Sequence, residues 1–375
     1  GNPLNASTKR LFRFLKLANS ASALLCAAKP KMMKNNIKNI AAVCIASITL
    51  TACNDWTDVE NIKVNQPDVK EINSELYAQY LQKLRTYKDS EHKFVYASFD
   101  NSIKTPFSRG HHLNDIPDSI DVVSLIYPDG LVEFEQKEIE NIRTNKATQI
   151  VYTISYDTIE EEYNQMVKTN QEADKDYVIP DFIPYLENAV KEALKPASVY
   201  NYDGLIIGYV GKSPSHMMEE EKNELLSIQN TFFNPIKTWM EQHKDKTFTL
   251  EGKPQNLVDK TILESFKHII LNTSNVTTVT ELSYNAEMAI MEEGVPGSFI
   301  VSVSTTDPNN KTTGLYDNGA KRALTEAAYW VSGDAINYEK AGLSIYNIER
   351  DYYNVNNAYQ YVREAIQIIN PAAKK

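Results

Sequence analysis

Cysteine is almost absent from this chain of 375 residues: there are three, the last of them is Cys53, and none follows. The chain beyond that point can therefore form no disulfide and no cysteine-ligated metal site. The six histidines do not fall at the spacing of a His-Glu-x-x-His zinc motif. His111 and His112 are adjacent, and neighbouring residues on a helix or strand point apart. We therefore expect no metal and no other cofactor.

Acidic residues are missing from the first 52 positions, which hold eight lysines and arginines. Because the formal net charge of the whole chain is −10, the remaining residues carry a charge of −18. Phosphate binding requires a basic surface, so this acidic body argues against a nucleic acid partner. We interpret the negative charge as a feature that favours solubility.

A basic start at Lys34 and Lys38 precedes an apolar run over residues 40–50, which is short for a transmembrane helix. The run ends in the sequence LTAC, at Cys53. This arrangement resembles a bacterial lipoprotein signal, in which the cysteine is acylated and becomes the new N-terminus. The acyl chains would then anchor the protein to a membrane. The alternative is a buried helix that contains a cysteine by chance.

The lipoprotein interpretation divides the chain into four parts. Residues 1–32 are expected to be an upstream extension outside the mature protein, and residues 33–52 a signal peptide. Residues 53–68 would be a tether and residues 69–375 the folded domain. The acidic stretch NDWTDVE after the cysteine resembles the export signal of surface lipoproteins of Bacteroidetes. We therefore expect a lipid-anchored protein of the outer membrane, exposed at the cell surface.

From residue 69 onward, short runs typical of β-strands alternate with helical patterns. The predicted strands are 93–99, 121–127, 148–155, 204–211, 247–250, 268–271, 298–304 and 342–346. The predicted helices are 69–88, 185–194, 219–240, 257–266, 284–292, 318–331 and 357–371.

Eight strands separated by helices fit a (β/α)₈ TIM barrel, which typically needs around 250 residues. A doubly wound open sheet is the alternative. The first strand, however, is followed by DNSIKTP and not by a glycine-rich phosphate-binding sequence, so the barrel is favoured.

The fourth predicted strand carries the most informative sequence, DGLIIGYV. This strand and the order of the elements resemble family 18 glycoside hydrolases, the chitinases and endo-β-N-acetylglucosaminidases, and in particular their Bacteroidetes lipoprotein branch in glycan-utilisation loci. The family strand reads Asp-Gly-x-Asp-x-Asp-x-Glu. Asp203 and Gly204 match its opening pair, but the later acids would fall on Ile206, Gly208 and Val210.

The resemblance implies a chemistry that this strand cannot perform. In the family, the glutamate protonates the glycosidic oxygen, the acetamido oxygen of the substrate attacks the anomeric carbon, and the preceding aspartate orients that acetamide. Val210 cannot donate a proton, and Gly208 cannot polarise an amide. Residues 206, 208 and 210 share one face of a strand, so that face should be apolar or empty. The resemblance therefore implies a hydrolase scaffold that has lost its catalytic acids.

A carboxylate from elsewhere could replace the missing acid, because several acidic residues follow predicted strands and could reach the C-terminal face of a barrel. An active endoglycosidase is thus an alternative interpretation. The candidate acids are Asp100, Glu251, Asp307 and Glu349.

Aromatic residues are abundant, with 22 Tyr, 12 Phe and 3 Trp, and aromatic rings can stack on the apolar faces of sugars. The family commonly places a tryptophan at the end of its last strand, where this chain has Tyr346. The alternative is that most of these rings pack between helices and barrel. The predicted glycan-binding residues are Phe99, Asp100, Tyr127, Tyr156, Tyr209, Tyr346 and Asn347.

Together these patterns predict a non-catalytic lipoprotein that captures a glycan or glycoprotein containing N-acetylglucosamine. Its expected partners are that ligand, an outer-membrane importer and the lipoproteins associated with it. A purely structural subunit of such an import complex is a further alternative.

Overall fold

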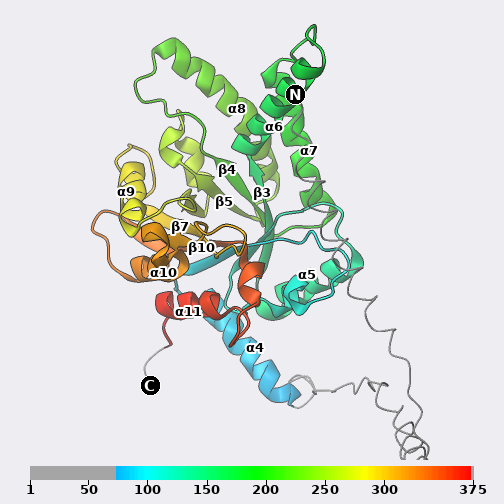
Figure 1. Cartoon of the computed structure of the whole chain (residues 1–375), viewed down its shortest axis with the longest axis vertical. Coiled ribbons are helices and arrows are strands. Elements are labelled where there is room, and N and C mark those ends of the chain that lie inside the picture. Colours follow the sequence, from blue (N-terminus) through cyan, green and yellow to red (C-terminus); the bar gives the residue numbers. More distant parts are fainter. Residues whose placement is uncertain (1–72, 373–375) are drawn as a thin grey trace, which may run out of the picture. The chain divides into compact units, whose positions relative to one another are not determined.

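The computed structural model describes residues 73–372 (Figure 1). The expected upstream extension (1–32), signal peptide (33–52), tether (53–68) and acylated Cys53 lie outside these residues. Within the described part of the chain, no helix is both long and apolar enough to cross a membrane.

Eight parallel strands form a closed barrel, as predicted. Neighbouring strands follow one another in the chain, and the last strand pairs with the first in register, Gly342 beside Phe94. The barrel strands are β1 (Phe94–Phe99), β2 (Val122–Leu125), β3 (Gln149–Ser155), β4 (Gly204–Tyr209), β5 (Thr247–Gly252), β6 (His268–Leu271), β7 (Ser298–Ser304) and β10 (Glu339–Tyr346).

Helices surround the strands, as Figure 1 shows. Two of them, α6 and α7, connect β3 to β4, whereas most connections have one helix or only short 3₁₀ turns. The helices are α4 (Ser74–Asp89), α5 (Glu133–Lys146), α6 (Tyr156–Ala173), α7 (Phe182–Val199), α8 (Glu219–Gln242), α9 (Val279–Ile290), α10 (Ala323–Ser332) and α11 (Gln360–Ile369).

Two local predictions were wrong. The helix expected over residues 257–266 is replaced by two short 3₁₀ turns, η4 (Pro254–Asn256) and η5 (Thr261–Ser265). The side chain of Asp259 accepts hydrogen bonds from the backbone and the hydroxyl of Thr261, and such local bonds compete with a helix.

The helix expected from residue 318 begins instead at Ala323, as α10. Asn318 adopts a left-handed conformation with φ 56°, which ends any helix at that point. The residues before α10 form a small hairpin, β8 (Leu315–Tyr316) with β9 (Lys321–Arg322).

The core has two layers, because successive residues of a strand point to opposite faces. On β4, Leu205, Ile207 and Tyr209 pack outward against the helices. Ile206 points the other way, into a separate apolar cluster that fills the barrel interior. The other buried members of that cluster are Tyr96, Val122, Val151, Ile270, Ile300 and Ala341.

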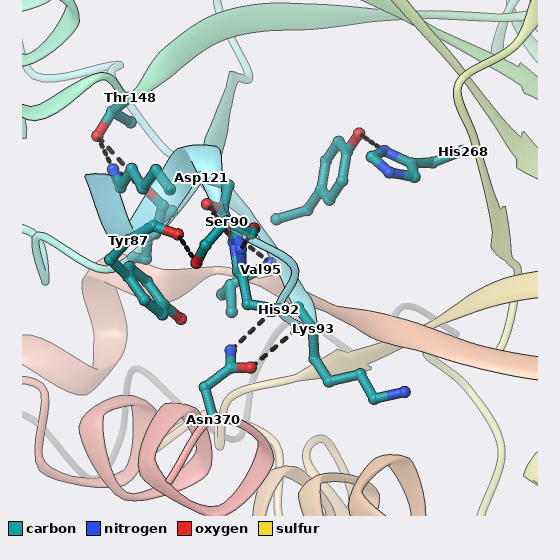
Figure 2. Close-up of polar contacts among 12 residues, drawn as sticks. Tyr87, Ser90, His92, Lys93, Val95, Asp121, Thr148, His268 and Asn370 are labelled. Carbon is teal, nitrogen blue, oxygen red and sulfur yellow. Dashed lines mark hydrogen bonds and ion pairs between the residues drawn. The ribbon is translucent and has the colours of Figure 1, made fainter. Parts of the chain in front are cut away.

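A network of polar contacts closes the barrel at the end where the strands begin (Figure 2). The carboxylate of Asp121 pairs with His92 Nε2 at 2.9 Å and accepts the Val95 N–H at 2.8 Å. Asn370, directly after α11, binds both the N–H and the C=O of Lys93 at 2.8 and 2.7 Å. Polar groups at this face of a barrel usually stabilise the fold. These contacts therefore fix the first strand and the last helix to each other.

Candidate functional site

A cavity of about 1010 Å³ opens at the other end of the barrel, where the strands finish. One wall comes from helices α6 and α7, and another from the loops 274–277 and 310–316. The side chains from the barrel strands and their ends are mostly small and hydroxylated. They include Ser98, Ser124, Thr153, Ser155, Ser304, Glu251, Tyr346 and Asn347.

The hydroxyl groups of this cavity are held by neighbouring strands. Ser124 and Thr153 lie 3.3 Å apart, oxygen to oxygen, across β2 and β3. The side chain of Asn347 donates to Ser304 Oγ at 3.2 Å, while its backbone N–H donates to Ser98 Oγ at 2.9 Å. Such groups can both donate and accept hydrogen bonds, so the cavity suits a ligand rich in hydroxyls.

Glu251 is the one carboxyl group that a barrel strand contributes to this lining. It belongs to β5 itself, one strand along from Gly208, with which it is in register. Burial raises the pKa of Glu251, and the hydrogen bond from the Tyr346 hydroxyl opposes that rise. Burial and the neighbouring Glu251 raise the pKa of Tyr346 well above its ordinary value. Both groups of the pair therefore hold their protons more tightly than they would in water.

The three positions where the family has acids are closed to that chemistry. Ile206 is 3% exposed and packs inside the barrel. A side chain on Gly208 would be crowded, because an added Cβ atom would lie 3.0 Å from Ser155 Cβ and 3.2 Å from Ser155 Oγ. A carboxyl group at position 208 would therefore require Ser155 to move.

Val210 follows β4 directly, and its backbone is held on both sides. Its N–H and that of Gly211 donate to the two carboxylate oxygens of Asp157, at 2.7 and 2.9 Å. Its C=O accepts the side chain of Asn256 at 2.8 Å. Position 210 is thus firmly placed and carries only hydrocarbon.

The seven predicted glycan-binding residues do not lie together in the structure. Tyr346 and Asn347 line the cavity. Tyr127 is 48% exposed and lies outside the cavity lining. Asp100 faces a second, smaller cavity.

The other three, Phe99, Tyr156 and Tyr209, are corrected: they are at most 4% exposed and lie in the core between barrel and helices. Tyr209 accepts the side chain of Gln229 at 2.8 Å there. For Phe99 and Tyr209 the reason is strand parity: Ser98 and Gly208 face inward, so the next residues along their strands face outward. Tyr156 is the first residue of α6 and packs in the same core.

Sequence reasoning did not identify the serines and threonines of the cavity. A usable signal was present in the period of two. Each of these serines and threonines stands at an inward-facing position of its own strand, as Ile206 and Tyr346 do on theirs. The four acidic residues that could replace the missing catalytic acid lie in two different cavities. Glu251 lies in the main cavity, and Asp100, Asp307 and Glu349 line the second one. Among the described residues, no group of three acidic, histidine or cysteine side chains is placed to hold a metal ion.

A closed parallel barrel with a cavity at the C-terminal ends of its strands defines the (β/α)₈ class. Within that class, the chain belongs to glycoside hydrolase family 18, BT1044-like, whose family model matches residues 57–368. No curated protein matches the chain.

Solved structures share the fold at low sequence identity. A selenomethionine variant of BT1044 is 17% identical, with a TM-score of 0.54 over 80% of this chain and 95% of that chain. An endo-β-N-acetylglucosaminidase from Cordyceps militaris is 13% identical, with a TM-score of 0.53 over 78% of this chain and 96% of that chain. A mutant of the same fungal enzyme, in complex with fucosyl-N-acetylglucosamine-Asn, is 12% identical, with a TM-score of 0.52 over 78% and 95%.

Proposed function

We propose that this protein binds a glycan containing N-acetylglucosamine, free or on a glycoprotein, and does not cleave it. The observation that carries the proposal is the contrast between two parts of one barrel mouth. The cavity is large and lined with hydroxyl groups. The strand that should supply the acids offers Ile206, Gly208 and Val210.

The size and polarity of the cavity support ligand binding. A cavity of about 1010 Å³ has room for a short oligosaccharide, since drug-sized ligands occupy roughly 300–1,000 Å³. Ser98, Ser124 and Thr153 offer hydroxyl groups from three consecutive strands. The aromatic ring of Tyr346 adds a surface for the apolar face of a sugar.

The loss of catalysis follows from the same geometry. General acid catalysis contributes roughly 10²–10⁴-fold to a rate, and it needs a proton donor within reach of the leaving oxygen. Substrate-assisted hydrolysis also needs a group that orients the acetamide. Neither Val210 nor Gly208 can serve, and a side chain at position 208 would crowd Ser155.

The sequence supports a cellular setting for this binding. The segment that ends in Cys53 would anchor the protein by lipid to the outer membrane, exposed at the cell surface. In that setting the protein would pass captured glycans to an outer-membrane importer and its associated lipoproteins.

One observation favours a second candidate function, an active glycosidase. Glu251 lines the cavity, stands next to Gly208 in the barrel, and has a raised pKa. A raised pKa makes a carboxyl group better suited to act as a general acid. Against this candidate, the strand beside it offers no second group to orient an acetamide.

A glycan array with the purified protein, followed by a reducing-end assay on each bound glycan, tests both functions. We expect retention of glycans that contain N-acetylglucosamine and no release of shorter sugars. Tyr346→Ala should weaken retention. Tyr284→Ala is the matched control, because Tyr284 is 60% exposed on α9 and lies outside the cavity lining. Release by the unaltered protein that Glu251→Gln abolishes would establish the glycosidase instead.

A further inference from the structure

A groove runs between helices α7 and α8, which pack against each other outside the barrel (Figure 1). It consists of two cavities of about 490 and 480 Å³ that share Asn234 and Pro235, and we call the two together the α7–α8 groove. None of its lining residues lines the main cavity. The groove is therefore a separate surface feature and no extension of the barrel mouth.

The α8 wall of this groove is unusual for a helix. Asparagine, serine and threonine form helices less readily than glutamate, lysine or glutamine, and proline is the weakest helix former of all. No glutamate or lysine of α8 lies in the lining. Reduced helix propensity confined to one face is the pattern expected of a functional surface. The lining contains every asparagine, serine, threonine and proline of α8: Asn223, Ser227, Asn230, Thr231, Asn234, Pro235 and Thr238.

The groove is neutral and offers unpaired amide groups. Its two charged lining residues, Glu187 and Lys191 of α7, pair with each other at 2.8 Å. Within the described part of the chain, no hydrogen bond is made by the side chains of Asn223, Asn230 and Asn234. Each carboxamide carries two donor hydrogens and one acceptor oxygen. The groove can therefore pair with a ligand that presents donors and acceptors together and carries no charge.

The spacing of these groups matches a polypeptide backbone. Lining positions 223, 227, 230, 234 and 238 are three or four residues apart, which is roughly 4.5–6 Å along a helix axis. An extended chain presents an N–H and a C=O on the same side about every 6.6 Å. From Asn223 to Gln242 the helix rises roughly 28 Å, the length of about eight extended residues.

A sugar fits this groove less well than a peptide does. Trp239 is the one aromatic residue in the lining. Its ring is stacked on His243, with centroids 3.9 Å apart and an angle of 15° between the planes. That face of the indole is therefore covered, whereas sugar recognition commonly uses an open aromatic face.

We infer that the α7–α8 groove binds an extended, uncharged segment of a partner polypeptide. The carboxamides of Asn223, Asn230 and Asn234 pair with its backbone, while Leu194 and Leu226 contact its apolar side chains. The inference adds a protein-binding site to the proposed function. It does not depend on glycan binding, because the groove and the main cavity share no residue.

Randomised ten-residue peptides displayed on phage are the probe, and the selected peptides are then synthesised for calorimetry. We expect the selected sequences to contain few charged residues. The double variant Asn230→Ala with Asn234→Ala should bind them about tenfold more weakly or worse, because two backbone-pairing groups are lost. The same variant should melt at a higher temperature, because alanine is the better helix former. Weaker binding by a more stable protein is not expected of residues that only maintain the fold.

The matched control is Asn164→Ala, an exposed asparagine of α6 outside the groove, which should leave peptide affinity unchanged. Tyr346→Ala should also leave it unchanged, which separates this test from glycan binding. N-methylation of alternate backbone nitrogens of the selected peptide, in one of its two registers, should abolish binding.

Three results would overturn the inference and leave the proposed function intact. One is a selection that yields no binding peptide, and another is equal peptide affinity of the double variant and the unaltered protein. The third is full binding by peptides N-methylated in either register, since the backbone would then make no essential contact. Loss of a retained glycan in the double variant would assign the groove to a sugar and also reject a peptide site.

Discussion

Ser155 crowds the position of a side chain on Gly208: a Cβ atom there would lie 3.0 Å from Ser155 Cβ. The two residues are in register on neighbouring strands β3 and β4. An aspartate restored at position 208 would therefore need a compensating shift of Ser155 on the adjacent strand.

Restoring the family acids should therefore fail. We expect the double variant Gly208→Asp with Val210→Glu to release no sugar and to melt at a lower temperature than the unaltered protein. Overpacking of this kind typically costs roughly 1–3 kcal/mol. A reducing-end assay and a thermal melt measure the two effects. Adding Ser155→Gly should recover part of the lost stability, and clear turnover by the double variant would contradict the proposed loss of function.

The second prediction concerns Asp157, whose carboxylate holds the N–H groups of Val210 and Gly211. Asp157→Ala removes both acceptors, so we expect the free energy of unfolding to fall by roughly 1–3 kcal/mol. Denaturant unfolding measures the change. Glu161→Ala, an exposed residue on the same helix, is the control and should have little effect. Equal stability of the two variants would show that this contact does not fix the end of β4.

The third prediction concerns pH and Glu251. Its folded pKa lies above the ordinary value of 4.5, so the folded state binds the proton more tightly than the unfolded state. Stability from this group is then complete below pH 4.5 and is lost as the pH rises through the folded pKa. Glu251→Gln cannot ionise, so we expect its stability relative to the unaltered protein to increase with pH over that window. Urea unfolding at a series of pH values measures the difference, and a constant difference would show that folding does not raise the pKa of Glu251.

The fourth prediction concerns His268, which lies at the start of β6 and whose Nδ1 is 2.7 Å from the Tyr96 hydroxyl (Figure 2). Burial lowers its pKa from 6.5 to about 4, with smaller contributions from Lys267 and His92. Between these pH values His268 is protonated in the unfolded state and neutral in the folded state. The free energy of unfolding therefore falls as the pH falls. The full shift corresponds to about 3 kcal/mol.

His268→Gln should reduce this acid-dependent loss, which thermal melts between pH 7 and pH 4 would measure. The pH dependence from His92 runs the other way. Its hydrogen bond to Asp121 raises its pKa, so the stability that His92 contributes is present below pH 6.5 and is lost as the pH rises. His216→Asn is the control, since His216 is exposed at φ 69°, a conformation that asparagine tolerates. An acid sensitivity that His268→Gln leaves unchanged would assign it to other groups.

The sequence was sufficient for the barrel because each strand carries its own local signal. Short apolar runs between helical segments mark the eight strands, and the period of two places Ile206 inside the barrel. The same period places Tyr209 and Phe99 on the outward face of their strands, so it conflicts with the prediction that these two residues bind a glycan.

Other features depend on contacts between distant segments, so no local pattern shows them. Glu251 meets Tyr346 only because closure of the barrel brings β5 and β10 around one cavity. The close approach of Ser155 to Gly208 depends on the register of two strands, which local sequence does not specify. The 3₁₀ turns at residues 254–265 replace a helix because side chains bind the backbone locally.

The hydrogen bonds between Asn370 and Lys93 affect the order in which the protein can fold during its synthesis. The first strand gains its second neighbour only from β10, and Lys93, directly before that strand, is held at its N–H and its C=O by a residue beyond α11. Contacts between such remote segments form late, since a long loop must close first. During synthesis the ring must therefore stay open until nearly the whole polypeptide has emerged, because the barrel closes only when β10 reaches β1.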